Sequence, residues 1–153
     1  MRTSIATLAA ISGLSSLASA VGNAVVLNNC PFPVYAWSVD STVSQEYTIN
    51  QGQTYSEVLH GDSTTGGVAI KITTVEGGLY NSSPETIYAY SLTNGEVWYD
   101  LSDVFGDPFS GSPLTVTASD ASCGSISWPD GVSPTGSQVN VCEDTADITL
   151  TLC

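Results

Sequence analysis

Positive charge is what this chain has least of. Its 153 residues include two Lys and Arg against fifteen Asp and Glu, which gives a formal net charge of −13. A surface that binds phosphates or anionic lipid headgroups needs cations to neutralise them. The composition therefore excludes nucleic acid as a partner. The hydrophobic fraction of 42% is too high for a disordered chain, and the length fits one folded domain.

The chain also lacks the usual sequence motifs of hydrolases and cofactor-dependent enzymes. Its single histidine, His60, has no GxSxG nucleophile motif around it, and the sequence contains neither a phosphate-binding loop nor a dinucleotide-binding fingerprint. There is no CxxC pair, and His60 lies beside Gly61 and Asp62 in a polar segment. We therefore expect His60 to be exposed to solvent, and we predict no cofactor and no metal site.

A mild apolar run occurs at the N-terminus. Residues 1–20 begin with Met1-Arg2 and end on Ala18-Ser19-Ala20, the small-residue pattern of a signal-peptide cleavage site. We expect cleavage after Ala20, a mature domain of residues 21–153, and a secreted protein that is extracellular or associated with the cell wall. No other stretch approaches the ~18 to 20 apolar residues that a membrane-spanning helix needs, so we expect no membrane span.

Two covalent modifications are predicted for the exported domain. An even number of cysteines in an exported domain indicates two disulfides, and spacing alone leaves three pairings open. The four cysteines are Cys30, Cys123, Cys142 and Cys153. Asn81-Ser82-Ser83 is an N-glycosylation sequon in a loop rich in Gly, Ser and Pro, and it marks Asn81 as a glycosylation site.

Short alternating runs separated by Gly, Asn, Asp, Ser and Pro fill the rest of the chain, with no sustained helical period. This pattern predicts an all-β sandwich. The expected strands are residues 24–27, 34–39, 46–49, 55–59, 68–73, 87–92, 97–101, 114–118, 125–128, 138–141 and 148–152. Asn94-Gly95 favours a type I′ hairpin turn, because both residues accept positive φ angles. Alternation beyond this turn places Trp98 and Asp100 on the face opposite to Tyr99.

Several segments resemble the thaumatin-like proteins, which are secreted β-sandwiches rich in disulfides. The Asn-Cys strand of residues 26–37 and the Tyr-Asp-Leu-Ser strand with its acidic loop, residues 99–109, carry this resemblance. A closer similarity, covering residues 25–153, is to the fungal Blastomyces yeast-phase-specific protein family. The segments typical of that family are residues 67–72, 98–102 and 127–131. The resemblance implies a thaumatin-like β-sandwich that is reduced to the central domain.

The resemblance also implies a disulfide pairing and a site. It pairs Cys30 with Cys153, and therefore Cys123 with Cys142. In thaumatin-like proteins an acidic cleft binds β-1,3-glucan and in some members hydrolyses it. Asp100 matches one acid of that cleft, and the other two acids are expected near Ala89 and Phe105, where this sequence has no carboxylate. Lys71 stands where the family carries an arginine, and without the additional cysteine-rich domain we expect an open groove.

Three carboxylates follow one another closely along the chain, at Asp100, Asp103 and Asp107. Two of them would serve glycoside hydrolysis if their carboxyl groups lay ~5 Å or ~6.5 to 9.5 Å apart. The alternatives are a solvated acidic surface and a calcium site, and the spacing lacks the ligand pattern of an EF-hand.

Carbohydrate binding without cleavage needs an aromatic platform beside a few polar groups. Trp98 next to Asp100 is the favoured pair. The other aromatic candidates, each with core packing as its alternative role, are Tyr35, Trp37, Tyr80 and Trp128.

We predict a monomeric, secreted, non-enzymatic protein of the fungal cell surface that binds cell-wall polysaccharide, a β-glucan, or an extracellular protein. The predicted ligand-binding residues are Trp98, Asp100, Asp103, Asp107 and Lys71. One alternative is an endo-β-1,3-glucanase that uses Asp100 with Asp103 or Asp107. Another is an adhesin or antigen that recognises host proteins, for which an acidic face favours basic partners.

Overall fold

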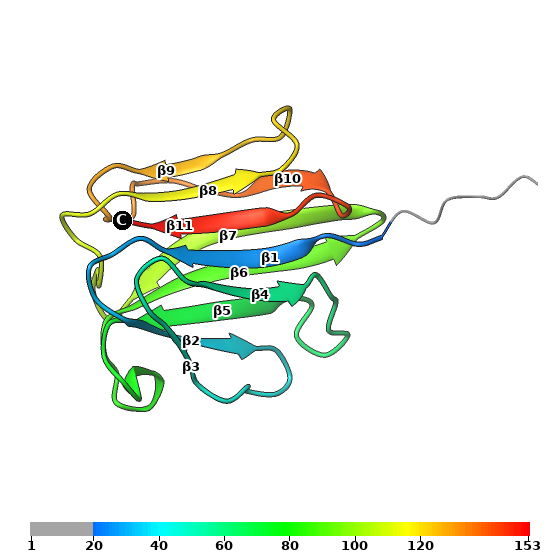
Figure 1. Ribbon diagram of the computed structural model, residues 1–153. Helices are drawn as coiled ribbons and strands as arrows, with labels where there is room; N and C mark the ends of the chain where they lie inside the picture. The colour runs from blue at the N-terminus through cyan, green and yellow to red at the C-terminus, as the bar shows by residue number, and fades with distance from the viewer. Residues whose placement is uncertain (1–19) are drawn as a thin grey trace, which may run out of the picture.

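Residues 20–153 are described by the computed structural model, so the predicted signal peptide lies outside the described residues except for Ala20. This part of the chain is folded into two stacked β-sheets and a single short 3₁₀ turn, η1 (Gly78–Tyr80) (Figure 1). The strands are β1 (Asn23–Asn28), β2 (Val34–Val39), β3 (Tyr47–Ile49), β4 (Thr54–Val58), β5 (Val68–Thr73), β6 (Glu85–Thr93), β7 (Glu96–Val104), β8 (Leu114–Ala118), β9 (Ile126–Trp128), β10 (Asn140–Glu143) and β11 (Ile148–Leu152). Among residues 20–153, no helix is long and apolar enough to cross a bilayer.

The two sheets have five and six strands. The order is β4-β1-β11-β8-β9 in the first sheet and β10-β7-β6-β5-β2-β3 in the second. β1 and β11 pair in parallel, and every other pairing between these strands is antiparallel. Each strand expected from the alternation is present, and the all-β sandwich is confirmed. The largest additions are at β6 and β7, which extend beyond the expected segments to nine residues each.

The hairpin between β6 and β7 forms as its turn residues require. Asn94 and Gly95 have φ angles of 55° and 82°, and Thr93 pairs with Glu96 across the turn. Positive φ at both central residues matches the turn to the right-handed twist of the strands. The register that follows runs without a break to the pair of Glu85 with Val104, so it determines which residues of β7 face outward.

The core lies between the sheets and takes one face of every strand. Ile70, Tyr88, Tyr99 and Leu150 are fully buried there. Burying a tyrosine leaves its hydroxyl in need of a partner. The Tyr88 hydroxyl meets this need by donating to the backbone carbonyl of Ile148 at 2.9 Å, a hydrogen bond that joins the two sheets.

Both disulfides have the pairing that the resemblance implies. Cys30, which follows β1, is bonded to Cys153 at the C-terminus, with the Cα atoms 5.0 Å apart. Cys123, just before β9, is bonded to Cys142 in β10, with a Cα separation of 5.3 Å. Because β9 and β10 are edge strands of different sheets, the second disulfide closes one edge of the sandwich.

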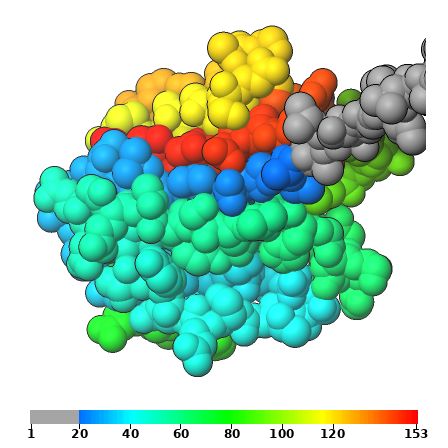
Figure 2. Space-filling model, turned by 45° about the vertical axis from the view of Figure 1, so that its right-hand side comes forward, coloured from blue at the N-terminus to red at the C-terminus, as the bar shows by residue number. Residues whose placement is uncertain are grey.

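The outer face of the five-stranded sheet is uncharged. Figure 2 shows its strands as neighbouring bands, with β11 in red beside β1 in blue. We call the outward-facing residues of these strands the neutral face: Asn23, Val25, Leu27, Thr54, Ser56, Val58, Thr115, Thr117, Ser127, Thr149 and Thr151. None of these described residues is charged, although the chain as a whole has a net charge of −13.

Candidate binding groove

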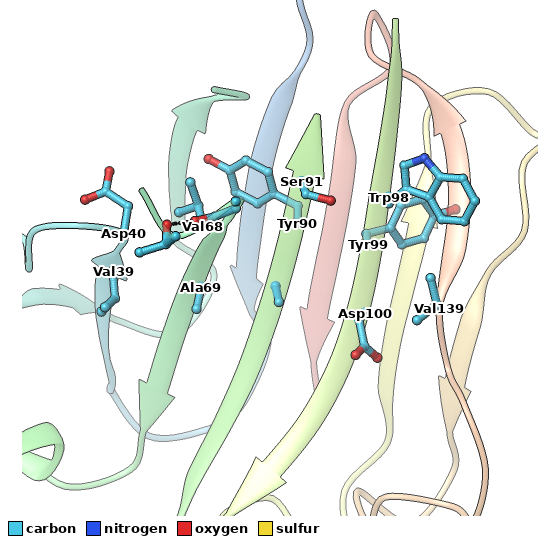
Figure 3. A pocket seen from close by; sticks show the side chains of 14 residues that line it. Val39, Asp40, Val68, Ala69, Tyr90, Ser91, Trp98, Tyr99, Asp100 and Val139 are labelled. Atoms are coloured by element: carbon cyan, nitrogen blue, oxygen red, sulfur yellow. Dashed lines mark hydrogen bonds between the residues drawn. The ribbon is translucent and has the colours of Figure 1, made fainter. Parts of the chain in front are cut away.

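A groove of about 510 Å³ lies on the outer face of the six-stranded sheet (Figure 3). Its floor is formed by small residues, Gly67 and Ala69 on or beside β5 and Ala89 and Ser91 on β6. Ala69 pairs directly with Ala89, so two short side chains lie next to each other in the middle of the sheet. Larger side chains on the flanking strands rise above them, and a depression results.

One wall of the groove holds the favoured aromatic and acidic pair. Trp98 and Asp100 are outward-facing residues of β7, and Figure 3 shows both beside Val139. The register places Trp98 opposite Ser91 and Asp100 opposite Ala89, so both are next to the floor. Trp98 is 42% exposed, which leaves a large aromatic surface available to a ligand. The structure thus brings Trp98 and Asp100 together in the groove.

The opposite wall comes from the end of β2 and from two loops that are held by short hydrogen bonds. It contains Val39, Asp40, Thr65 and Gly66. The Asp40 carboxylate accepts a hydrogen bond from the backbone N–H of Thr42 at 2.7 Å, and this bond lowers the pKa of Asp40. A hydrogen bond stabilises the charged form of a carboxyl group, so Asp40 is ionised at neutral pH.

Asp62 links the same two loops. Its Oδ2 accepts a hydrogen bond from the Ser41 hydroxyl at 2.6 Å, and its Oδ1 accepts one from the backbone N–H of Thr65 at 2.8 Å. These bonds, with Ser41 contributing most, lower the pKa of Asp62 well below its usual value. The Asp62 carboxylate therefore stays charged and keeps its hydrogen bonds over the whole pH range in which proteins are normally folded.

His60 contacts this wall and remains partly exposed to solvent, as its polar sequence context indicates. Its side chain is 43% exposed, and Nε2 lies 3.6 Å from an Asp40 oxygen. Nδ1 lies 3.0 Å from the Val58 carbonyl oxygen and 3.1 Å from the Tyr90 hydroxyl. The Val58 carbonyl, assisted by the nearby Glu57 and Asp40 carboxylates, raises the pKa of His60.

The three acids of the predicted cluster do not share one site. Asp100 and Asp103 are three positions apart on an unbroken strand, so their side chains leave opposite faces of the sheet. Asp103 accepts a hydrogen bond from the Thr86 hydroxyl at 2.5 Å and lies beside Asp107. Burial, together with the Asp107 carboxyl, raises the pKa of Asp103 to about 6. The structure therefore joins Asp103 to Asp107 and separates both from Asp100.

Asp103→Asn is expected to stabilise the protein at neutral pH. The pKa of about 6 lies above the unfolded value of 3.8, so the folded state binds a proton more readily, and stability falls as the pH rises between these values. Asn removes this loss, and we expect a gain on the order of 1 kcal/mol at about pH 7.5, limited because Asp103 as a whole is only partly buried, and no gain at about pH 4. Urea unfolding at both pH values measures it, and an equal effect at the two would contradict the assignment.

The Lys71 ammonium group forms an ion pair with a carboxylate of the same chain. Its Nζ lies 3.1 Å from Oε1 of Glu85, a carboxylate that is only 2% exposed. Lys71 points outward on β5 but does not line the groove. The ammonium group that was predicted to bind a ligand is thus engaged with Glu85.

The other predicted residues lie away from the groove. Trp37 and Trp128 are buried, and both serve as core or packing residues. Tyr80 is 74% exposed and packs edge-on against Trp37, with ring centroids 6.4 Å apart. Tyr35 is half-buried on β2, and Asn81 is exposed beside Tyr80, where its Oδ1 accepts a hydrogen bond from the Ser83 hydroxyl.

Sequence reasoning missed the floor and the second wall. The signal available was a pair of small residues at alternate positions, Gly67 with Ala69 and Ala89 with Ser91. Such pairs form a groove floor only once β5 is known to lie beside β6, and that pairing is not local in the sequence.

The architecture and the disulfides define a thaumatin-like β-sandwich. The solved structure of the protein elicitor MoHrip2 from Magnaporthe oryzae superimposes with a TM-score of 0.71 at 25% identity, over 86% of this chain and 98% of the other. The thaumatin-like xylanase inhibitor TLXI has a TM-score of 0.51 at 14% identity, over 84% of this chain and 97% of the inhibitor, and shows the fold alone.

The sequence comparisons identify the family within this class. Residues 11–153 match the family described as Blastomyces yeast-phase-specific protein, and the chain belongs to that family. It is 34% identical over 136 residues to an antigenic thaumatin-like protein of Arthroderma benhamiae, covering 85% of this chain and 67% of the relative. It is 30% identical over 161 residues to the secreted thaumatin-like protein calA of Emericella nidulans, covering 97% and 91%. The protein is accordingly a secreted, extracellular one.

Proposed function

We propose that this secreted protein binds neutral β-glucan of the fungal cell wall in the groove and does not cleave it. The observation that carries the proposal is the exposed indole of Trp98 beside a floor of small residues. A flat aromatic surface packs against the apolar C–H face of a sugar ring, and a few polar groups then fix its orientation. The Asp100 carboxylate and the Ser91 hydroxyl are placed to accept hydrogen bonds from sugar hydroxyls.

The form of the groove suits a polymer. It is open, and its floor of Gly67, Ala69 and Ala89 presents no long side chain that would block an extended chain of sugars. A neutral polymer also needs no counter-charge from the protein. This matters because Lys71, the one Lys or Arg among the described residues, is engaged with Glu85.

The positions of the groove carboxylates argue against hydrolysis. Among the described residues that line the groove, Asp40 and Asp100 are the acids, and they belong to opposite walls. Three strand spacings separate β2 from β7, which is about 14 Å at ~4.8 Å each. Glycosidases need their two carboxyl groups no more than ~9.5 Å apart. Asp40 is also hydrogen-bonded to Thr42, so it is not free to turn across the groove.

The names of the related proteins support a position outside the cell. One relative is named as antigenic, another as secreted, and one structural neighbour as a protein elicitor. A protein that binds cell-wall polysaccharide has the same position.

Trp98→Ala is expected to weaken binding to particulate β-1,3-glucan about 30-fold, the loss that corresponds to the ~2 kcal/mol of a typical aromatic hot spot. Trp98→Phe, which keeps a ring, should retain most of the affinity. Phe105→Ala is the matched control, because Phe105 is 69% exposed and lies outside the groove. Depletion of the protein from solution at increasing polymer concentration measures the affinity.

Two results would contradict the proposal. Equal retention of the wild type and Trp98→Ala would show that the indole is not the platform. Release of reducing sugars by the wild type that Asp100→Asn abolishes would show that the protein is a glucanase.

A further inference from the structure

The neutral face stands out from the rest of this acidic molecule. Fifteen carboxylates are distributed over the chain, yet no described residue that points outward from the five-stranded sheet carries a charge. The carboxylate that borders the face, Asp147, accepts hydrogen bonds from the backbone and side-chain nitrogens of Asn23 at 2.8 and 2.9 Å. Solubility alone would favour charged residues at such positions.

Four threonines form a regular array at the centre of the neutral face. Thr115 pairs with Thr151, and Thr117 pairs with Thr149, on the adjacent strands β8 and β11. Sheet geometry spaces their side chains at ~4.8 Å across the strands and ~6.8 Å along them. Each threonine offers a hydroxyl that donates and accepts hydrogen bonds, with a methyl group beside it. The surface is thus a repeating pattern of hydroxyl and methyl groups.

The next strands continue this pattern without charge. Val25 lies opposite Thr149 on one side and opposite Ser56 on the other, so one row runs across four strands as Thr117, Thr149, Val25 and Ser56. Figure 2 shows β11 and β1, the middle strands of this row, lying side by side on the visible face. Such a row fits an uncharged partner that exchanges hydrogen bonds with its hydroxyl groups.

The size of the face distinguishes between partners. Five strands at ~4.8 Å and about five residues at ~3.4 Å cover about 400 Å². A stable protein interface buries about 800 Å² of accessible surface on each partner, so a flat footprint of this size is at the small end for a stable dimer. A polymer makes no such demand, because the groove of the same molecule can hold it as well, and two linked weak contacts act together.

We propose that the neutral face binds the ordered surface of insoluble neutral cell-wall polysaccharide. This inference rests on the polymer class of the proposed function and assigns it a second, separate surface. The groove and the neutral face are on opposite outer faces of the sandwich. The groove binds a single polysaccharide chain, and the neutral face lies against polysaccharide chains that are packed side by side. One protein molecule thus links two parts of the cell wall.

Charging the neutral face tests the proposal. Thr117→Glu combined with Thr149→Lys leaves the net charge unchanged and sets opposite charges across from each other, a pairing that a sheet tolerates. We expect at least about a 10-fold loss of binding to particulate β-1,3-glucan, because two charges must then be desolvated against a neutral surface. Ser56→Glu, on the exposed edge strand β4, should give the same direction of change without altering the central strands.

Binding of a soluble β-1,3-glucan oligosaccharide is the second readout. It reports the groove alone, so the charged variants should bind the oligosaccharide as the wild type does, which also shows that they are folded. Thr135→Glu, in an exposed loop, is the control for added charge and should bind particles normally. Trp98→Ala should show the reverse pattern, with oligosaccharide binding lost and part of the particle binding retained.

The outcomes separate the two proposals. If Thr117→Glu/Thr149→Lys and Ser56→Glu bind particles as well as the wild type, the neutral face is not a binding surface, whatever Trp98→Ala does. A concentration-dependent dimer in sedimentation velocity that both charged variants abolish would also overturn the inference, because the face would then be a contact between copies. If Trp98→Ala alone behaves as the wild type in both assays, the groove proposal fails and the neutral face stands.

Discussion

Replacing Cys30 and Cys153 together by alanine is expected to lower the free energy of unfolding by about 5 kcal/mol. The bond links residues 123 positions apart, so it restricts nearly the whole unfolded chain. In the chain-entropy model the stabilisation grows with the logarithm of the loop length, which makes this the stronger of the two disulfides. A loss of this size is a large part of the 5–15 kcal/mol by which domains are usually stable, and the double variant should unfold near body temperature.

The second disulfide supplies the control. Cys123 and Cys142 are 19 positions apart, and their joint replacement should cost about 3 kcal/mol. Guanidinium unfolding monitored by tryptophan fluorescence measures both pairs of variants. Equal losses for the two disulfides, or a larger loss for Cys123 and Cys142, would contradict the entropic account.

Lys71→Met is expected to destabilise the fold by about 3–5 kcal/mol, the usual cost of leaving a buried charge without its partner. Glu85 is 2% exposed, and its Oε1 has no hydrogen-bond partner among the described residues apart from the ion pair with Lys71. Met keeps the length of the Lys side chain and removes its charge. The variant therefore tests the ion pair with little change in packing.

A second substitution shows whether the charge is the cause. Glu85→Gln added to Lys71→Met should restore most of the lost stability, because replacing both members of a buried ion pair is often nearly neutral. The four proteins of this double-mutant cycle are compared by urea unfolding. A double variant as unstable as Lys71→Met would show that the side-chain stem of Lys71, and not its charge, supports the structure.

Local alternation predicts the strands of this protein well because each strand has one buried face. Ile148, Leu150 and Leu152 are buried and Thr149 and Thr151 are not, and this pattern is readable in the sequence alone. The Asn94-Gly95 turn also defines the outward position of Trp98 and Asp100 by a purely local rule. No local pattern predicts the disulfide pairing, and only the family resemblance implied it.

The parts that sequence did not predict depend on contacts between distant segments. Lys71 meets Glu85 because β5 lies beside β6, and Glu85 falls outside the strand expected at residues 87–92. His60 contacts Asp40 and Tyr90, which lie 20 and 30 positions away in the sequence. The residues next to His60 therefore do not predict these contacts. For the same reason the floor of the groove could not be recognised before the strands were paired.

Asp100, Asp103 and Asp107 are chemically equivalent candidates for the binding site, and only the geometry of β7 and its loop distinguishes them. Asp100 and Asp103 are close in sequence, and strand alternation nevertheless separates them onto two faces of the sheet. This separation leaves Asp100 as the acid beside Trp98 and turns Asp103 toward Thr86 and Asp107. The short distance in sequence suggested that Asp100 and Asp103 act as a pair. Residues three positions apart on a β-strand point to opposite faces of the sheet, so the two carboxylates do not meet.

Titration of the ¹⁵N-labelled protein with a soluble β-1,3-glucan oligosaccharide, followed by NMR, tests the central claim most directly. The account predicts that the largest shift changes occur at the Trp98 indole and at the backbone of Ala69, Ala89 and Asp100, with the oligosaccharide recovered intact. Shift changes centred on Asp103 and Asp107, or cleavage of the oligosaccharide during the titration, would contradict it.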